Sequence, residues 1–193
     1  MIETVKDIDL DYLKSFRKRI YYFGLGFIQV ILSPSHRLHF YSPELPAITE
    51  DIHNHRYDFI SKVVKGELTQ TCYALSDWGL WFEKPDPPDG TPNVYIAKEE
   101  SCNPNIKTES PTKLVHLWPY ATGSETYQEG ESYIVKHYEQ HTVKATNCIT
   151  SLVRGHYKKQ AAVVYYPRGK TPVCPFSKEI PEPELWEIIG RML

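Results

Sequence analysis

Residues 53–59 read His-Asn-His-Arg-Tyr-Asp-Phe, and they lead into an apolar run at 60–66 that a glycine closes. Successive side chains of an extended strand point to opposite faces, so His53 and His55 leave the strand on the same face. Two imidazoles held on one face can bind one divalent metal ion. A metal site is therefore the first hypothesis that the sequence supports.

Strand-like runs, rich in aromatic and β-branched residues, fill the chain on both sides of this stretch. The clearest runs cover 27–32, 37–41, 60–73, 112–118, 132–135, 148–154 and 161–166. Many strands of similar length with turn residues between them indicate a sandwich or a barrel. Residues 7–20 and 181–192 place acidic residues early in an apolar helical pattern, which predicts a short helix at each end.

Residues 84–111 interrupt the strand pattern with a cluster of prolines that no central strand tolerates. We interpret this segment as a long surface loop inserted into the fold. The chain of 193 residues is long enough for one sizeable domain, and its hydrophobic content of 41% can fill one core. The sequence therefore predicts a single domain over residues 1–193.

Composition argues against several classes of partner. The net charge of −2 comes from scattered charges, with no basic stripe for nucleic acid and no polybasic cluster for a membrane surface. No apolar segment reaches the roughly 20 residues of a membrane span, and the first residues do not resemble a signal peptide. The four cysteines, at positions 72, 102, 148 and 174, lie far apart. These features predict a reduced, cytoplasmic protein.

The spacing of His53, His55 and Gly66 resembles the first motif of the cupin superfamily. That motif has His-x-His, then a glutamate, then a glycine, and Gly66 falls eleven residues after His55, as in its shorter version. Phe59 stands at the glutamate position. The second cupin motif opens with a glycine and reaches a histidine eleven residues later. Its skeleton is present at 130–141, although the proline and second glycine expected inside it are absent.

A more local resemblance is to uncharacterised cupin-like proteins that read Arg-Leu-His and then His-x-His-x-Trp/Tyr-Asp-Phe-x-Ser. Residues 37–39 and 53–61 match this pattern, and residues 149–155 are similar to a late strand of the same proteins. The resemblances cover 37–75 and 130–166. They imply a double-stranded β-helix, the cupin jelly-roll barrel. With the two end helices, the expected fold is all-β with a short N-terminal and a short C-terminal helix.

The resemblance implies that His53, His55 and His141 bind the metal ion. Three imidazoles leave the charge of the ion intact and leave positions open for water, dioxygen or substrate. Asp58 is the nearest carboxylate and a further candidate ligand. Strand parity places Asp58 opposite His55, so it reaches the ion only across a turn or a bulge. The remaining candidate donors are Glu67, Gln70, His116 and His137.

Arg154 and Tyr133 are the candidate catalytic residues. Arg154 ends a strand that often lines the cavity in cupin barrels, where a guanidinium can bind a substrate carboxylate through two hydrogen bonds. The alternative for Arg154 is an ion pair at the rim. Tyr133 and Tyr57 could present phenols to the same cavity or pack in the core.

The leading hypothesis is a mononuclear site for a divalent metal ion, with Fe(II) favoured over Zn, Ni or Mn, in a dioxygenase acting on a small molecule. One alternative is a cupin that binds a metal or a small ligand without turnover. Another is a metal-assisted sugar isomerase or epimerase, which needs a general base such as Glu67, Tyr133 or His137. A 2-oxoglutarate oxygenase is disfavoured, because His55 stands where those enzymes have a carboxylate. By analogy with other cupins we expect a homodimer.

Overall fold

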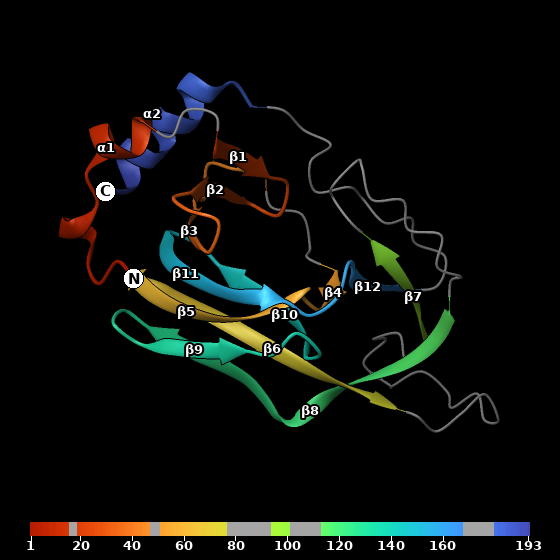
Figure 1. Cartoon of the computed structure of the whole chain (residues 1–193). Coiled ribbons are helices and arrows are strands. Elements are labelled where there is room, and N and C mark those ends of the chain that lie inside the picture. The colour runs from red at the N-terminus through yellow and green to blue at the C-terminus, as the bar shows by residue number, and fades with distance from the viewer. Residues whose placement is uncertain (16–18, 47–50, 77–93, 101–112, 168–179) are drawn as a thin grey trace.

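The computed structural model describes residues 1–15, 19–46, 51–76, 94–100, 113–167 and 180–193. Most of the regular structure in these residues is β-strand, arranged in two antiparallel sheets (Figure 1). The first sheet has the order β1 (Ile20–Phe23), β2 (Phe27–Ile31), β3 (His36–Tyr41), β11 (Cys148–Tyr157), β5 (Tyr57–Lys65) and β9 (Ser132–Val135). The second sheet closes into a barrel in the order β10 (Gln140–Ala145), β4 (Ile52–His53), β12 (Ala162–Pro167), β7 (Val94–Glu100), β8 (Lys113–Gln128) and β6 (Glu67–Ser76).

The strand pairing identifies the fold as a double-stranded β-helix. Strand β3 pairs with β11, β4 with β10, β5 with β9, and β6 with β8, all antiparallel. These four pairings are nested along the chain, so the segment from β3 to β11 is one long hairpin. From β3 to β6, and again from β8 to β11, successive strands alternate between the first and the second sheet, which is the winding of a jelly roll. Strand β7 is a further member of the second sheet. The predicted all-β jelly-roll fold is confirmed.

The outer face of the first sheet is covered by helices. The 3-10 helix η1 (Val5–Asp7) and the helix α1 (Leu10–Lys14) precede the strands, and α2 (Glu182–Met192) follows them (Figure 1). Helix α2 buries one face against the sheet, through Leu185, Trp186, Ile188, Ile189 and Met192. Each apolar side chain buried in this way stabilises the fold by about 1.5–3 kcal/mol. The predicted C-terminal helix is confirmed.

The inner face of the first sheet points into the jelly roll and forms a separate cluster. Alternation along β5 buries Tyr57, Phe59, Ser61 and Val63 on this face. The cluster also contains Phe27, Tyr41, Leu68, Tyr133, Val135, Cys148 and Leu152. The interior of the jelly roll is therefore rich in aromatic side chains.

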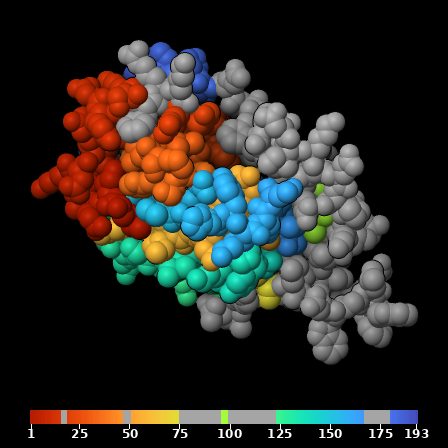
Figure 2. Space-filling view, viewed as in Figure 1, coloured from red at the N-terminus to blue at the C-terminus, as the bar shows by residue number. Residues whose placement is uncertain are grey.

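The N-terminal segment, in red, lies against the first sheet on the face that Figure 2 shows. The backbone N–H of Ile2 donates to Oγ of Ser151 on β11, at 3.1 Å. The Glu3 carboxylate accepts from the Lys62 ammonium on β5. These contacts attach the first residues to two neighbouring strands.

The structure differs from the prediction at the N-terminal helix. Helix α1 covers five residues rather than 7–20. Asp9 sets its start, because the carboxylate accepts hydrogen bonds from the backbone N–H groups of Asp11 and Tyr12. Strand β1 already begins at Ile20, where aromatic residues favour an extended chain.

Two further strand predictions need correction. The run 60–73 is two strands, because Gly66 adopts a φ of +78° and turns the chain between β5 and β6. The segment 84–111, predicted as one inserted loop, contains strand β7 at 94–100. That stretch lies between the prolines and carries Val, Tyr and Ile, so its local β-propensity outweighs the composition of the segment. The rest of 84–111 lies outside the described residues.

Two other sequence features can be compared with the structure. Cys72 and Cys148 are free thiols, and positions 102 and 174 lie outside the described residues. None of the helices in the described ranges has the length and apolar character needed to cross a bilayer.

Candidate metal centre

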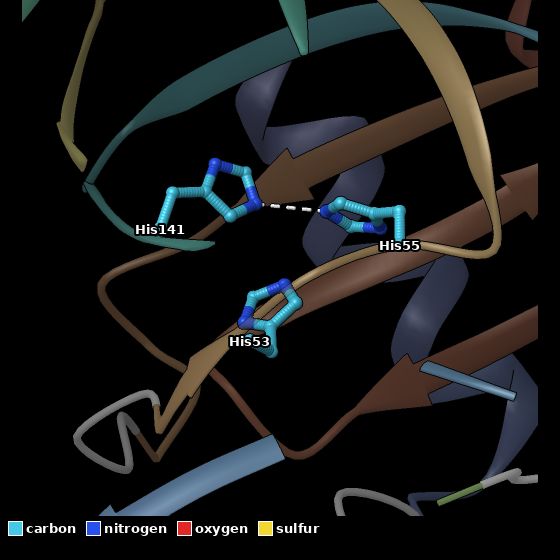
Figure 3. A group of neighbouring side chains, drawn as sticks. All are labelled: His53, His55 and His141. Carbon is cyan, nitrogen blue, oxygen red and sulfur yellow. Dashed lines mark hydrogen bonds between the residues drawn. The ribbon is translucent and has the colours of Figure 1, made fainter. Parts of the chain in front are cut away.

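Three histidines from two strands and one connecting loop meet inside the jelly roll. His53 ends β4, His55 follows two residues later, and His141 lies on β10 directly opposite His53. The ring centroids are 4.9 Å apart in each of the three pairs (Figure 3). One ring nitrogen from each residue lies within 4.8 Å of the others, as a shared metal ion requires.

The hydrogen bonds of the rings decide which nitrogen faces the centre. Nδ1 of His53 lies 3.0 Å from the carbonyl oxygen of Asp51, and only a protonated Nδ1 can bond to a carbonyl. The lone pair of His53 is therefore on Nε2. His55 and His141 approach each other with their Nε2 atoms 2.8 Å apart (Figure 3). Nitrogen ligands at about 2.1 Å from one ion are about 3.0–3.5 Å apart, so a small displacement would admit the ion.

Burial keeps two of these imidazoles neutral. It lowers the pKa of His55 well below the usual value, and the neighbouring His53 and His141 lower it further. Burial and the proximity of His53 lower the pKa of His141 in the same direction. Neutral imidazole is the form that binds metal ions, so His55 and His141 are both in the binding form.

Asn54 fixes the backbone that carries His53 and His55. Its buried side chain accepts hydrogen bonds at Oδ1 from Nζ of Lys159 (2.6 Å) and from the backbone N–H of Val163 (2.8 Å). Its own backbone N–H donates to the carbonyl of Val163 at 3.0 Å. Asn54 is thereby tied to the start of β12, on the side of the chain away from the two imidazoles.

Phe59 stands beside the histidines, where the cupin motif has its glutamate. Its ring centroid is 4.8 Å from that of His55 and 6.4 Å from those of His141 and Tyr133. The residue at this position therefore supplies an apolar wall. Among the described residues, the group that could hold an ion consists of three histidines and no carboxylate.

Asp58 is not part of this group, which corrects the prediction that it could be a ligand. Its Oδ1 accepts hydrogen bonds from the backbone N–H and from Nδ1 of His137, both at 2.8 Å. The register shift at this point puts the extra residue on β11, between Arg154 and Tyr157, while β5 keeps its alternation. Strand parity therefore keeps Asp58 on the face opposite Phe59. The same contact engages His137, another candidate donor.

The hydrogen bonds from His137 lower the pKa of Asp58. A carboxyl group whose pKa is lower in the folded than in the unfolded protein stabilises the fold above its unfolded pKa. That stabilisation disappears as the pH falls through the folded pKa. We expect the difference in unfolding free energy between wild type and Asp58→Ala to be full at about pH 6 and to shrink below about pH 4. Urea unfolding of wild type and Asp58→Ala at both pH values measures this difference. The same comparison in a His137→Ala background shows whether the difference depends on His137. A difference that is independent of pH would contradict this assignment.

Strand β6 places two more groups on the inner surface. Cys72 is the cross-strand neighbour of His141, and burial raises the pKa of its thiol. Nε2 of Gln70 donates to Sγ of Cys72 at 3.4 Å, whereas Oε1 of Gln70 has no partner among the described residues. Sequence reasoning missed Cys72, although strand parity with Gln70 would have pointed to it.

The other candidate donors lie elsewhere. Glu67 is exposed, and its carboxylate accepts a hydrogen bond from the Gln128 amide at 3.2 Å. His116 belongs to β8, but its side chain is outside the described residues.

The two candidate catalytic residues both belong to the inner face of the first sheet. Tyr133 is buried, and its ring stacks on that of Tyr127 with centroids 4.6 Å apart. Cζ of Arg154 lies 5.2 Å from the ring centroid of Tyr57 and 4.2 Å from that of Tyr157. Arg154 pairs with no carboxylate of the described residues, so the predicted alternative of a rim ion pair is not observed there.

Comparison with models of protein families finds no match, and comparison with curated proteins finds none either. Among solved structures, the chain is similar to hydroquinone 1,2-dioxygenase PnpCD in complex with Cd2+ and 4-hydroxybenzonitrile. The sequences are 10% identical, the TM-score is 0.36, and the match covers 82% of each chain. The fold assignment rests on the nested strand pairing of this chain and not on that likeness.

Proposed function

We propose that His53, His55 and His141 bind one divalent metal ion, with Fe(II) as the favoured ion, and that the protein is a dioxygenase for a small molecule. The observation that carries the proposal is the approach of three imidazole nitrogens to within 4.8 Å of one another. Nε2 of His55 and Nε2 of His141 face each other at 2.8 Å, and Nδ1 of His53 bonds to the carbonyl of Asp51, which leaves Nε2 of His53 for an ion. The donor set therefore fits a metal ion.

A divalent ion held by three neutral nitrogens keeps its full charge and would supply Lewis acidity and, as iron, the activation of dioxygen. The residues of the chain do the remaining work. Phe59 stands beside His55 and keeps the immediate surroundings apolar. Tyr133 extends this wall, because its ring contacts that of Phe59 at 6.4 Å between centroids. Such a wall limits access of water to a reacting molecule.

A second candidate function is a cupin that binds a metal or small ligand without turnover. The observation that favours it is that no carboxylate stands beside the histidines among the described residues. Of the candidate bases, Tyr133 is the one that lies near them, across the ring of Phe59. Glu67 is exposed, and His137 is hydrogen-bonded to Asp58. The same observation disfavours a sugar isomerase, which needs a base near the ion. Four expectations from the sequence stay predictions: a small-molecule ligand, a homodimer, a single domain and a cytoplasmic location.

The proposal is tested by metal content and oxygen consumption. Purified protein is reconstituted with Fe(II), Zn(II), Ni(II) or Mn(II), analysed for bound metal, and assayed with thiols and dihydroxybenzenes in an oxygen electrode. We expect about one ion per chain and oxygen uptake with the Fe(II) form only. Bound metal without uptake across the panel supports the binding protein instead. Wild-type protein that retains no metal overturns the metal site, and with it the dioxygenase and the metal-binding form of the second candidate.

A further inference from the structure

Five buried side-chain nitrogen or oxygen atoms of the described residues have no hydrogen-bond partner. All five belong to residues on the inner faces of the two sheets, namely Arg37, Ser61, Gln70, His141 and Arg154. Buried polar groups in folded proteins are nearly always paired with protein, water or a ligand. Their concentration on one interior surface therefore points to a polar ligand there.

Two of these five residues are arginines on neighbouring strands. Arg37 on β3 pairs with Leu152 of β11, and Arg154 stands two residues further along β11. Both guanidinium groups lie near one ring, with Cζ of Arg37 5.6 Å and Cζ of Arg154 5.2 Å from the centroid of Tyr57. The buried Nε of each is unpaired. The strand pairing thus brings two guanidinium groups together around one phenol.

No negative charge balances this pair within the described part of the chain. Nη1 of Arg37 donates to the neutral amide oxygen of Gln29 at 3.0 Å, and Nη1 of Arg154 donates to the carbonyl of Gly155 at 3.3 Å. His39, which also contacts Gln29, is neutral, because burial and the charge of Arg37 lower its pKa to about 3. Neither arginine forms an ion pair with a described carboxylate. Two adjacent cations without an anion are suited to an anionic ligand.

The arginine pair lies next to the three histidines. The ring centroid of Tyr57 is 6.0 Å from that of His55 and 6.4 Å from that of Phe59. A molecule whose anionic end meets the two guanidinium groups would therefore extend along these aromatic rings toward the histidines. The planar donors of a guanidinium match the two oxygens of a carboxylate, and the aromatic wall suits an apolar body.

We propose that Arg37 and Arg154 together bind the carboxylate of a small organic acid, with its apolar body directed along Tyr57 toward the three histidines. As a statement about the substrate class, this rests on the proposed function. The arginine site itself needs no metal ion. Phosphate has the same oxyanion chemistry, so the experiment compares the two anions directly.

The test is isothermal titration calorimetry of the full chain with benzoate, benzyl alcohol and inorganic phosphate, in metal-free and metal-loaded protein. We expect benzoate to bind, benzyl alcohol to show no detectable binding, and phosphate to bind at least tenfold more weakly than benzoate. Arg37→Gln and Arg154→Gln should each weaken benzoate binding at least tenfold. Arg191→Gln, which changes an exposed arginine paired with Glu44, should leave it unchanged.

Arg154→Lys keeps the charge but loses the planar pair of donors. This variant tests the arginine site if the Arg154→Gln protein does not fold. We expect it to weaken benzoate binding at least tenfold. Equal affinity of wild type and the Arg154→Lys variant, or tighter binding of phosphate than of benzoate, would overturn the proposal. Benzoate binding in a protein that takes up no metal would support the arginine site while refuting the metal site. Metal binding without benzoate binding would support the metal site and refute the arginine site.

Discussion

Replacing His53 with alanine is expected to abolish the stabilisation that a divalent metal ion gives the wild-type protein. An ion that binds only the folded chain raises the free energy of unfolding by about 2.7 kcal/mol at a free concentration 100 times its Kd. His53 contributes one of three converging nitrogens, and two imidazoles alone bind far more weakly. His53 is also more exposed than His141, so its replacement leaves the core in place. Urea unfolding with and without Zn(II) measures the effect.

A matched control is His156→Ala. His156 is an exposed histidine on β11, outside the three-histidine group. We expect this variant to gain the same stabilisation from Zn(II) as the wild type. If both variants lost it, or if His53→Ala kept it, the stabilising ion would be bound elsewhere and the three-histidine site would be refuted.

Gly66→Ala is expected to lower the free energy of unfolding by about 3 kcal/mol or more, through backbone strain and a steric clash. Gly66 has a φ of +78°, which side-chain-bearing residues rarely adopt. A Cβ atom there would lie 2.6 Å from the carbonyl oxygen of Asn147 and 3.2 Å from Cα of Cys148. Both are backbone atoms, one in the residue before β11 and one in its first residue, so they cannot move aside as a flexible side chain could.

Gly130→Ala separates the two causes of this loss. Gly130 has a similar φ of +90°, but a Cβ atom there would meet nothing within 4 Å. Its substitution carries only the cost of the left-handed conformation, about 1–2 kcal/mol. Urea unfolding of both variants gives the comparison. Equal losses would show that the close approach of β11 to Gly66 does not contribute to stability.

Local patterns of the sequence were sufficient for several features. The alternation of a strand put His53 and His55 on one side of the chain, and the structure keeps their rings 4.9 Å apart. The apolar face of residues 181–192 predicted α2. Gly66 was identified by its spacing, and it is the residue that turns the chain between β5 and β6. In each case the physical cause acts within a few residues: side-chain periodicity, helix amphipathicity, or the conformational freedom of glycine.

Other predictions were wrong because they rested on composition or periodicity within one segment of the sequence. The prolines of 84–111 predicted a loop, yet β7 forms there because it pairs with β8 and β12 on both sides. The helical pattern of 7–20 yields only α1, since Asp9 caps the helix and β1 takes the residues from Ile20. In the first segment, strand pairing and local β-propensity outweighed the proline content. In the second, the cap at Asp9 and the hairpin of β1 with β2 limited the helix.

Contacts between distant parts of the chain decide which residues make up the three-histidine site and the arginine site. His141 is 86 residues from His55, and only the pairing of β10 with β4 places the two rings in contact. The same kind of pairing brings Arg37 beside Arg154. It also allows His137 to reach Asp58, which strand parity holds on the face away from the histidines. The sequence determined which residues could bind a metal and on which face they stand. The tertiary structure decided which of them meet, because strand register between distant segments sets those distances.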